Sequence, residues 1–435
     1  MDRRNFALFC TAVLTFWLFA LAFGTANGYG VRGMNAQIRA AGARPVTDAL
    51  APDATTSPAE FVVSPQTEKT EPVSAQPQPA ALPLSCRAAI LVDRATGTVL
   101  YEKDADRQLP IASITKVMTL LLTFEAIHDG KIDYTDIVPV SEHAYHMGGS
   151  QIWLEPGEQL TLDEMLKAVC VSSANDAAVA VAEFVGGSEP VFVEQMNLRA
   201  ARLGMSGTTF RNACGLDEAG HLSTARDVAV MSREILLTCP EVERYTTIWM
   251  DTLRGGQTQL LNTNKLLKRY SGITGLKTGT TGGAGVCITA AATRDGLSLI
   301  AVVLGAPSSA ERFADAETLL DYGFANYEAA PLPDLSAAPL ALSVRGGLQP
   351  EVRLDYSALP TALLLKKGEG SALSVQVQLP EQLSAPVDGG DEIGTVTVYN
   401  GSDSLGSWPV RAAETVPHLQ LGDAVQLLLY RLAGA

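Results

Sequence analysis

The first chemical feature of the sequence is a serine and a lysine three positions apart, Ser113 and Lys116, at the start of an apolar stretch. A serine hydroxyl is a weak nucleophile unless a base lies nearby. Residues three apart on a helix share a face, so the amine of Lys116 would lie beside the hydroxyl of Ser113. Burial lowers a lysine pKa and lets the amine accept that proton. The pattern is weak by itself, but a lysine in an apolar helix is costly unless it has partners.

A second polar group follows at Ser173 and Asn175, inside the small-residue stretch VSSANDAAVA. The hydroxyl of Ser173 would relay a proton to a leaving amine. The amide of Asn175 would hold the amine of Lys116 and a substrate carbonyl. A loop that joins two helices uses the same residue types, so this motif alone indicates little.

A third motif, Lys277-Thr278-Gly279, lies on a predicted strand. A strand beside the nucleophile can pair with an extended peptide through backbone hydrogen bonds. The charge of Lys277 would make the site more positive, and the hydroxyl of Thr278 would bind a carboxylate. Gly279 would let another backbone approach closely, and the N–H groups of Thr280 and Ser113 would form an oxyanion hole. The alternative interpretation of this motif is an ordinary strand end without a role in binding or catalysis.

These three motifs occur once each, in this order, on a predicted helix start, a loop and a strand. Each motif alone is weak evidence for a function, but their order and placement make the combination stronger evidence. The combination is typical of class A β-lactamases and penicillin-binding proteins.

The predicted elements explain how the motifs are positioned. Two strand-like runs, 88–93 and 98–101, are joined by a turn and predict a hairpin. The run 111–127 is apolar on nearly every side, which predicts a helix buried at the centre of a domain. Residues 162–184 predict further helix, interrupted around 171–175.

Strand patterns return around the third motif, in the runs GLKTG, VCITAAAT and LSLIAVVLGA. Before them, Thr224 and Asp227 form a capping-box-like start of another helix, and a last helix is expected over 311–324. Strands, then helices, then strands predict one α+β domain over about 85–330, whose sheet combines strands from both ends.

After Pro331 the sequence changes character. Short runs such as LALSV, EVRLDY, LSVQVQL and GTVTVY alternate with Gly, Pro and Asp, which predicts an all-β module ending near Val410. Residues 420–433 then place five apolar side chains on one helical face: Leu421, Val425, Leu428, Leu429 and Leu432. This helix would either pack on the β module or lie on a membrane surface, and the sequence favours neither strongly.

The N-terminus indicates export. Two arginines precede an apolar run over 6–23, and Gly24 and Ala26 offer the small residues that a signal peptidase accepts. The run is nearly long enough to span a bilayer, so an uncleaved anchor is the alternative. Either way we expect the bulk of the chain outside the cytoplasm, in the cell envelope or secreted. Residues 51–83 are rich in proline and predict an extended tether.

Composition narrows the function classes. The formal net charge is −15 and no Lys/Arg-rich stretch appears, which argues against a nucleic-acid partner. Six cysteines without a CxxC pair argue against a structural zinc site. Cys10 lies in the export segment, and among the other five a chance disulfide stays open, with at least one thiol free. His143 and His146 lack the glutamate of the zincin motif, so we expect no metal and no cofactor.

Longer stretches around the motifs match a known family. MGGSQIWLEPGEQLTLDEMLKAVCVSSANDAAVAVAE contains the second motif, and RNACGLDEAGHLSTARDVA and LLNTNKLLKRYSGITGLKTGTTGGAGVC follow it. In these stretches the sequence resembles the serine-type D-alanyl-D-alanine carboxypeptidases, the low-molecular-weight penicillin-binding proteins. The resemblance runs from about 85 to 330 and more loosely through the β module. One small departure is Ala174, where the family often has glycine.

The resemblance implies a role for each residue of the first two motifs. Ser113 would be the acylated nucleophile and Lys116 its base. Ser173 and Asn175 would complete the proton network around them.

The resemblance also implies how the substrate is held. Lys277 and Thr278 would bind the end of the substrate, beside Gly279 and Thr280. Arg312 stands where the family places an arginine that helps bind the terminal carboxylate. A bidentate guanidinium suits that task.

The implied fold is an α+β, β-lactamase/transpeptidase-like catalytic domain, an antiparallel sheet with helices on both sides, followed by a small all-β domain. The implied reaction removes the terminal D-alanine from peptidoglycan stem peptides through an acyl-enzyme, and β-lactam antibiotics would acylate the same serine. The expected segments are a signal peptide or anchor, a Pro/Ala-rich linker, the catalytic domain, the all-β domain and an amphipathic helix: 1–26, 27–84, 85–330, 331–411 and 412–435.

Three alternatives stay open. A β-lactamase must deacylate fast, and class A enzymes use an extra glutamate on a loop after the second motif, which we do not identify here. A DD-endopeptidase on the same scaffold would differ only in its products. A non-enzymatic wall-binding or β-lactam-sensing protein is the third, and the intact motifs argue against it. Membrane association through the N-terminal segment or the C-terminal helix also stays open.

Overall fold

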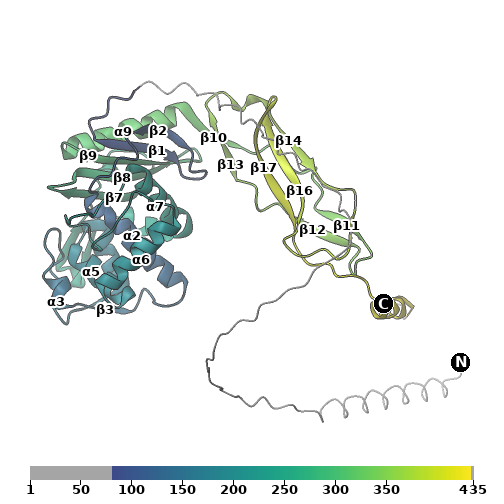
Figure 1. Cartoon of the computed structure of the whole chain (residues 1–435), viewed down its shortest axis with the longest axis horizontal. Coiled ribbons are helices and arrows are strands. Elements are labelled where there is room, and N and C mark those ends of the chain that lie inside the picture. Colours follow the sequence, from purple (N-terminus) through teal and green to yellow (C-terminus); the bar gives the residue numbers. More distant parts are fainter. Residues whose placement is uncertain (1–80, 433–435) are drawn as a thin grey trace, which may run out of the picture. The chain divides into compact units, whose positions relative to one another are not determined.

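The computed structural model describes residues 81–432, and the first part of this chain is built on a five-stranded antiparallel sheet (Figure 1). The strand order is β2-β1-β9-β8-β7. The bounds are β1 (Ala88–Asp93), β2 (Val99–Lys103), β7 (Ile273–Thr281), β8 (Gly285–Arg294) and β9 (Leu297–Ala306). The N-terminal hairpin therefore joins the C-terminal strands through the pair β1–β9, as the sequence predicts. Strand β7, which carries the third motif, lies at the edge.

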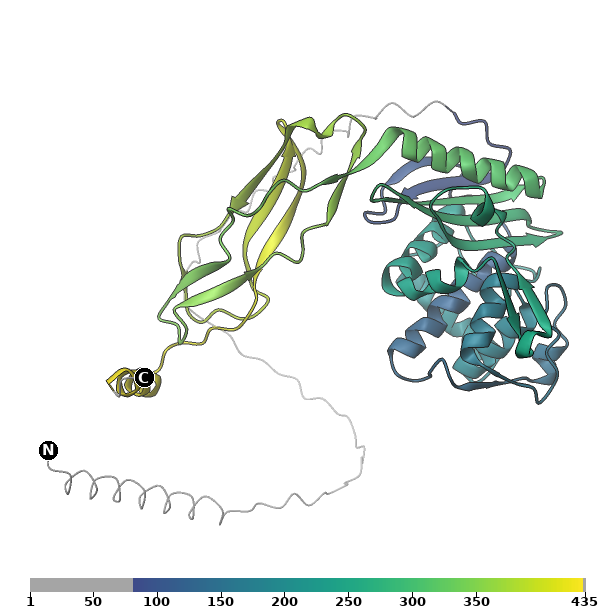
Figure 2. The same cartoon turned by 180° about the vertical axis from the view of Figure 1, so that it is seen from behind.

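Helices cover both faces of this sheet, as predicted (Figure 2). On one face α9 (Ser309–Asn326) packs against β8 and β9 and buries Phe313, Leu319 and Leu320. The other face packs against α7 (Ala225–Thr238) and the helical region beyond it. Because apolar layers lie on both sides, β1 and β9 are buried along almost their whole length. This explains why their sequences are continuous apolar runs rather than alternating ones.

The helix after the first motif, α2 (Lys116–His128), is buried except in its last turn. The sequence predicts one continuous helix here, but the chain first makes a 3-10 turn, η1 (Ala112–Thr115). The predicted interruption at 171–175 is a π-helical turn, η2 (Ala168–Ser172), before α5 (Asn175–Gly186). Both irregular turns adjoin residues of the motifs.

Several further elements complete the helical region. α7 begins after Thr224, whose hydroxyl accepts the N–H of Asp227, as predicted. The sequence analysis did not anticipate α6 (Glu189–Arg202). The remaining elements are short helices and hairpin strands: β3 (Ile137–Pro139), α3 (Glu142–Tyr145), β4 (Gln159–Thr161), α4 (Leu162–Lys167), α8 (Glu243–Thr246), β5 (Met250–Leu253) and β6 (Thr258–Leu261).

The second part of the described chain is all-β, as predicted. A six-stranded sheet has the order β14-β16-β17-β12-β11-β15, and β10 pairs with β13. The strands are β10 (Tyr327–Pro331), β11 (Ala341–Arg345), β12 (Glu351–Asp355), β13 (Ala362–Lys366), β14 (Leu373–Gln378), β15 (Leu383–Ser384), β16 (Glu392–Asn400) and β17 (Asp403–Ala412). The sequence analysis missed β17 because Gly406 and Pro409 interrupt its strand pattern.

The last described helix, α10 (Leu421–Leu432), leaves apolar side chains uncovered. Leu421 is 83% exposed and Leu428 is 59% exposed, so the structure does not pack these side chains on the β module. No helix among residues 81–432 has both the length and the apolar character needed to cross a membrane. The predicted export segment, 1–26, and nearly all of the predicted linker, 27–84, lie outside the described residues.

Candidate active site

Ser113 lies on η1 and Lys116 is the first residue of α2, so the pair spans the junction between a 3-10 turn and an α-helix. In a 3-10 turn, side chains at positions i and i+3 eclipse each other. Nζ of Lys116 accordingly lies 3.0 Å from Oγ of Ser113. The two groups are as close as the sequence pattern predicts, although the turn that joins them is tighter than an α-helix.

The amine of Lys116 is buried and has three oxygen neighbours. Besides the contact with Ser113, Nζ donates to Asn175 Oδ1 at 2.6 Å and to the backbone oxygen of Cys214 at 2.7 Å. Asn175 Nδ2 donates to the carbonyl of Gly148 at 2.6 Å, so its Oδ1 must face the lysine. Burial lowers the pKa of Lys116 to about 8. The arrangement therefore supplies a base that is partly neutral near physiological pH.

Backbone segments pack tightly around Ser113. Ala112, directly before Ser113, has a φ of 50°. A Cβ atom on Gly215 would lie 2.0 Å from the carbonyl oxygen of Ala112, and a Cβ atom on Gly279 would lie 3.0 Å from the amide nitrogen of Ser113. Only glycine lets these segments come so close. The close approach predicted for Gly279 is therefore present, and the neighbouring backbone is that of the turn that carries Ser113.

The second motif begins where η2 ends. Ser173 follows that turn with a φ of 60°, which is uncommon for a residue other than glycine. Its Oγ accepts a hydrogen bond from Nζ of Lys277 at 2.8 Å. Asn175 is the first residue of α5, and its backbone N–H donates to the carbonyl of Ser150 at 2.7 Å. The loop thus contacts one lysine through Ser173 and the other, Lys116, through Asn175.

Lys277 lies in the middle of β7 and is only 2% exposed. Its amine donates to Ser173 and, at 3.0 Å, to the backbone oxygen of Thr278. Burial lowers the pKa of Lys277 well below its usual value, and the charge of Lys116 lowers it further. Because the charges of these two buried amines repel each other, a doubly protonated site is costly, which favours a state with one neutral amine.

The second half of β7 meets Arg312 from α9. Nη1 of Arg312 donates to the carbonyl of Gly279 and to Oγ1 of Thr280, both at 3.4 Å. Its Nε is buried without a hydrogen-bond partner, and burial lowers the pKa of the guanidinium to about 10. Within residues 81–432 no carboxylate lies at ion-pair distance from Arg312. Thr278, one position before Gly279, lies 2.6 Å from Thr263 through the two Oγ1 atoms.

The structure therefore brings the three motifs together in two hydrogen-bonded groups, which the backbone of the second motif joins: the pair of Ser173 and Lys277, and the network of Ser113, Lys116 and Asn175. Two members of this network were missed by the sequence analysis, namely the carbonyls of Cys214 and Gly148. Backbone groups have no residue-type signal, so nothing in the sequence could have indicated them.

Asp176, directly after Asn175, makes contacts that indicate a structural role. Its carboxylate accepts the N–H groups of Ile152 and Leu154, each at 3.1 Å. These hydrogen bonds hold the segment that follows Gly148 in the chain. The carbonyl of Gly148 accepts a hydrogen bond from Asn175 Nδ2. Asp176 thus positions the second motif rather than reaching the nucleophile.

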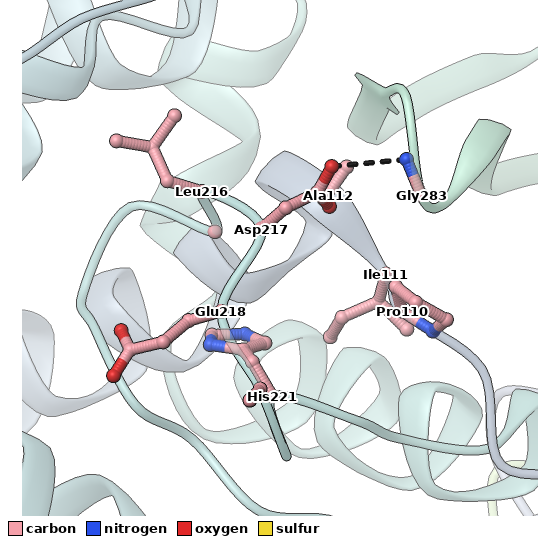
Figure 3. A pocket seen from close by; sticks show the side chains of 10 residues that line it. Pro110, Ile111, Ala112, Leu216, Asp217, Glu218, His221 and Gly283 are labelled. Atoms are coloured by element: carbon pink, nitrogen blue, oxygen red, sulfur yellow. Dashed lines mark hydrogen bonds between the residues drawn. The ribbon is translucent and has the colours of Figure 1, made fainter.

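A pocket of about 280 Å³ opens beside the turn that carries Ser113 (Figure 3). Ala112 lines it together with the loop that contains Asp217 and His221. Nε2 of the buried His221 lies 2.7 Å from Oγ1 of Thr115, which donates to the carbonyl of Ala112 at 2.8 Å. Asp217 accepts the N–H of Gly283 at 2.9 Å and so ties this loop to the turn after β7. Sequence analysis missed His221 because its partner is distant in the chain.

The other residues weighed from the sequence lie in ordinary structural settings. His143 and His146 are exposed, and Nε2 of His143 lies 2.6 Å from Glu189. Nδ1 of His146 lies 2.7 Å from a carbonyl of its own short helix. The five cysteines within the described residues are free and buried, so no disulfide joins any two of them.

Two family models match this chain. Residues 73–308 match the model described as D-alanyl-D-alanine carboxypeptidase, and residues 344–418 match the penicillin-binding protein 5, C-terminal domain. D-alanyl-D-alanine carboxypeptidase DacF of Bacillus subtilis is 43% identical over 332 residues, which cover 75% of this chain and 85% of the relative. D-alanyl-D-alanine carboxypeptidase DacC of Escherichia coli is 35% identical over 341 residues, which cover 77% and 84%.

Solved structures show the same architecture. Penicillin binding protein 5 from Haemophilus influenzae aligns with a TM-score of 0.66 at 29% identity, covering 78% of this chain and 99% of that one. Penicillin-binding protein D2 from Listeria monocytogenes, solved in the ampicillin-bound form, aligns with a TM-score of 0.52 at 34% identity, covering 56% and 99%. The predicted fold, an α+β domain followed by a small all-β domain, is confirmed by these likenesses.

Proposed function

Because this chain belongs to the D-alanyl-D-alanine carboxypeptidase family, we propose that the network around Ser113 is its active site and that Ser113 is the residue acylated. The protein is a serine-type D-alanyl-D-alanine carboxypeptidase, a hydrolase of the penicillin-binding protein class. One observation carries the assignment of the nucleophile, namely the 3.0 Å contact between Ser113 Oγ and the buried amine of Lys116.

In the first step Ser113 Oγ attacks the carbonyl carbon between two D-alanine residues. The neutral amine of Lys116 takes the hydroxyl proton. Negative charge then develops on the carbonyl oxygen, and the N–H groups of Ser113 and Thr280 stabilise it. These two groups lie on the turn and the strand that Gly279 allows to approach each other.

The peptide C–N bond then breaks and the terminal D-alanine leaves. Through the hydroxyl of Ser173, which Lys277 contacts at 2.8 Å, its nitrogen receives the proton that Lys116 took from Ser113, and Lys116 is neutral again. The acyl group stays on Ser113 as an ester. A water molecule, deprotonated by Lys116, then cleaves the ester and restores the serine. One water is consumed and one D-alanine is released.

The edge position of β7 supports the way in which the substrate is held. An edge strand has unpaired backbone groups, and an extended peptide can add to it as a further strand. Lys277 adds positive potential beside it. Thr278 and Arg312 bind the terminal carboxylate, because Arg312 carries a charge that no carboxylate within residues 81–432 neutralises.

Penicillins and other β-lactams acylate the same serine in this proposal. A β-lactam resembles the scissile dipeptide, but it leaves an acyl-enzyme that water removes slowly. The ampicillin-bound and cefotaxime-bound forms of the Listeria relative support this part.

The site of action and the segments are also part of the proposal. Residues 1–26 export the chain and 27–84 tether a catalytic domain, 85–330, and an all-β domain, 331–411. The helix in 412–435 lies on a membrane surface, since apolar side chains of α10 are uncovered. The substrates are peptidoglycan stem peptides outside the cytoplasm.

Mass spectrometry after penicillin treatment tests the nucleophile. We expect one equivalent of covalent adduct on the parent and none on Ser113→Ala. Ser188→Ala is a matched control, because Ser188 precedes a helix without making a side-chain cap hydrogen bond. Chromatography should detect D-alanine released from a peptide ending in D-Ala-D-Ala by the parent and the control only. An adduct on Ser113→Ala would overturn the assignment.

The same assays separate the alternatives, which the family assignment does not favour. Rapid turnover of nitrocefin would indicate a β-lactamase, and cleavage of cross-linked muropeptide dimers would indicate a DD-endopeptidase. A protein that never becomes labelled by fluorescent penicillin would instead be a wall-binding or sensing protein.

A further inference from the structure

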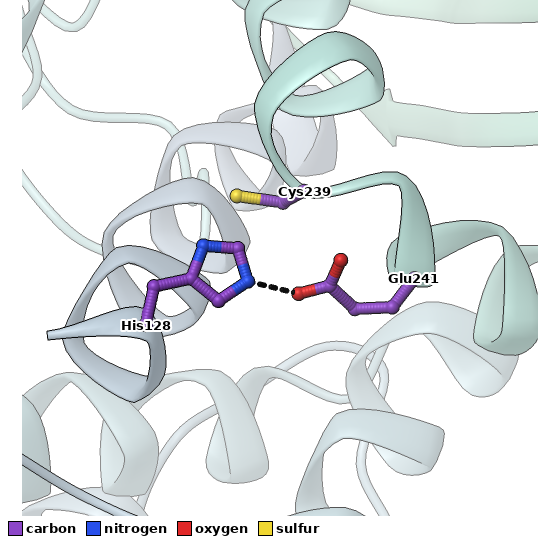
Figure 4. A group of neighbouring side chains, drawn as sticks. All are labelled: His128, Cys239 and Glu241. Carbon is purple, nitrogen blue, oxygen red and sulfur yellow. Dashed lines mark hydrogen bonds and ion pairs between the residues drawn. The ribbon is translucent and has the colours of Figure 1, made fainter. Parts of the chain in front are cut away.

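A cluster of metal-ligating side chains lies outside the Ser113 network, among residues 81–432. It consists of His128, Cys239 and Glu241 (Figure 4). His128 ends α2, Cys239 directly follows α7, and Glu241 lies in the 3-10 turn η3 (Pro240–Val242). Their ligating atoms all lie within 4.8 Å of one another. Figure 4 shows the three side chains pointing into one common space.

We propose that His128, Cys239 and Glu241 bind a divalent cation of the zinc type. A thiolate, an imidazole and a carboxylate are all zinc ligands, and water in a fourth position completes a tetrahedral shell. Metal–ligand bonds of about 2.0–2.3 Å place neighbouring ligand atoms roughly 3.5 Å apart. Small side-chain movements would close the present separations, and the side chain of His128, 45% exposed, has room to make them.

Two of the ligands are held at a fixed spacing by the backbone. The N–H of Cys239 donates to the carbonyl of Ile235 at 2.9 Å, and the N–H of Val242 donates to the carbonyl of Cys239 at 3.0 Å. Pro240, between the two ligands, restricts its own φ. Cys239 and Glu241 are therefore presented together before any ion binds.

The third ligand already faces the other two. Nε2 of His128 lies 2.6 Å from Oε1 of Glu241, and the thiol of Cys239 lies close to both side chains (Figure 4). The carboxylate of Glu241 lies beside this thiol, and those of Glu125 and Glu234 lie near enough to act on it electrostatically. The same negative charges attract a cation. On binding, the S–H bond breaks, a sulfur–metal bond forms and the proton passes to solvent.

A bound ion would join the end of α2 to the corner between α7 and η3. Since α2 begins at Lys116, this would brace the helix that carries the base at its other end. The role is structural and is separate from the acyl transfer. Sequence analysis expected no metal because it looked for ligands close together in the chain, whereas His128 and Cys239 are far apart in it.

Cobalt(II) is a suitable optical probe for this site. We expect the metal-free, full-length chain to bind one equivalent of Co²⁺ with a thiolate charge-transfer band and the d–d bands of a tetrahedral site. Adding Zn²⁺ should bleach both. Cys239→Ser should lose the thiolate band, and His128→Asn should bind Zn²⁺ more than about 10-fold more weakly. Zn²⁺ should also raise the Tm of the parent and not that of His128→Asn.

His146→Asn is the matched control, because His146 is also exposed and lies beside a glutamate but has no cysteine near it. It should bind like the parent. The proposal is overturned if the parent shows no thiolate band, or if His128→Asn binds Zn²⁺ as tightly as the parent. His128 is exposed, so this variant stays informative even where Cys239→Ser folds poorly. Penicillin labelling of Ser113 should persist in His128→Asn, which keeps this test independent of the active-site assignment.

Discussion

Nζ of Lys116 lies 3.0 Å from Oγ of Ser113, and of the three neighbours of this amine only that hydroxyl can donate a hydrogen bond. A neutral amine has two N–H bonds and one lone pair. Asn175 Oδ1 and the carbonyl of Cys214 accept the two N–H bonds, so the lone pair faces Ser113. Loss of one proton from Lys116 therefore leaves its lone pair directed at the hydroxyl of Ser113, as the proposed base and nucleophile require.

Acylation should accordingly rise with pH until Lys116 is neutral. Burial lowers the pKa of Lys116 to about 8, so at lower pH most molecules hold an unreactive ammonium. The second-order rate constant for acylation by penicillin should rise about tenfold per pH unit well below that pKa and level off above it. Stopped-flow measurement across this range tests the prediction. Lys116→Met should react roughly 100- to 10,000-fold more slowly, without this rise. A flat profile for the parent would contradict the role of Lys116.

Ser173→Ala should impair departure of the D-alanine amine. The variant removes the hydroxyl to which Lys277 donates at 2.8 Å, so the proton path to the leaving nitrogen is broken. We expect kcat for peptide hydrolysis to fall about 100-fold or more, with KM little changed. Ser172→Ala is a suitable control, because Ser172 makes no side-chain hydrogen bond within residues 81–432. A rise in KM at unchanged kcat would indicate a binding role instead.

Gly279→Ala should displace the nucleophile. Its Cβ atom would lie 2.8 Å from the carbonyl oxygen of Ile111 and 3.0 Å from the amide nitrogen of Ser113. Because small misplacements of reacting groups are costly, we expect penicillin acylation to slow about 100-fold. Gly282→Ala, in the turn after β7, meets nothing within 4 Å and should react normally. Equal rates for the two variants would show that the turn adapts.

Asp176→Asn should destabilise the fold. Both carboxylate oxygens accept backbone N–H groups, from Ile152 and Leu154 among others, so an amide NH₂ would meet another donor. We expect a loss of about 1.5–3 kcal/mol in the free energy of unfolding, measured by urea denaturation. Asp133→Asn, at an exposed turn, should change stability little. A neutral effect at Asp176 would mean that the segment is held by other contacts.

His221 should make the fold sensitive to acid. Its Nδ1 accepts the N–H of Arg211 at 3.2 Å, so Nε2 carries the proton that is donated to Thr115. Burial lowers the pKa of His221 from 6.5 to about 4. Between these values the unfolded chain binds a proton that the folded chain does not, so stability falls as pH falls through this window. The loss should approach roughly 3 kcal/mol at the lower end.

Urea denaturation of the parent and of His221→Gln at several pH values measures how much His221 contributes to the pH dependence of the free energy of unfolding. The glutamine variant cannot be protonated, so its stability should depend less on pH within the window. A pH dependence that is identical in both proteins would show that other groups cause the acid sensitivity.

The sequence by itself determined the family resemblance, the candidate site residues and most of the elements in their order, with α6 as an exception. Ser113 and Lys116 were identified as candidates by residue type and spacing, because i, i+3 neighbours on a helix share a face. Lys277 was identified by the Lys-Thr-Gly motif on a predicted strand. The buried character of α2 and β9 was evident from apolar runs that have no polar face. Such patterns depend only on residues that are close together in the chain, so they can be recognised without knowledge of the tertiary structure.

Only the tertiary structure decided which groups meet across the chain. The carbonyl of Cys214 accepts a hydrogen bond from Lys116. Arg312 contacts β7 from α9, which covers the face of the sheet opposite to α7. His128 meets Cys239 because the end of α2 packs beside the end of α7. These contacts depend on how helices and sheet pack in three dimensions, and no spacing along a single chain encodes a distance between segments so far apart.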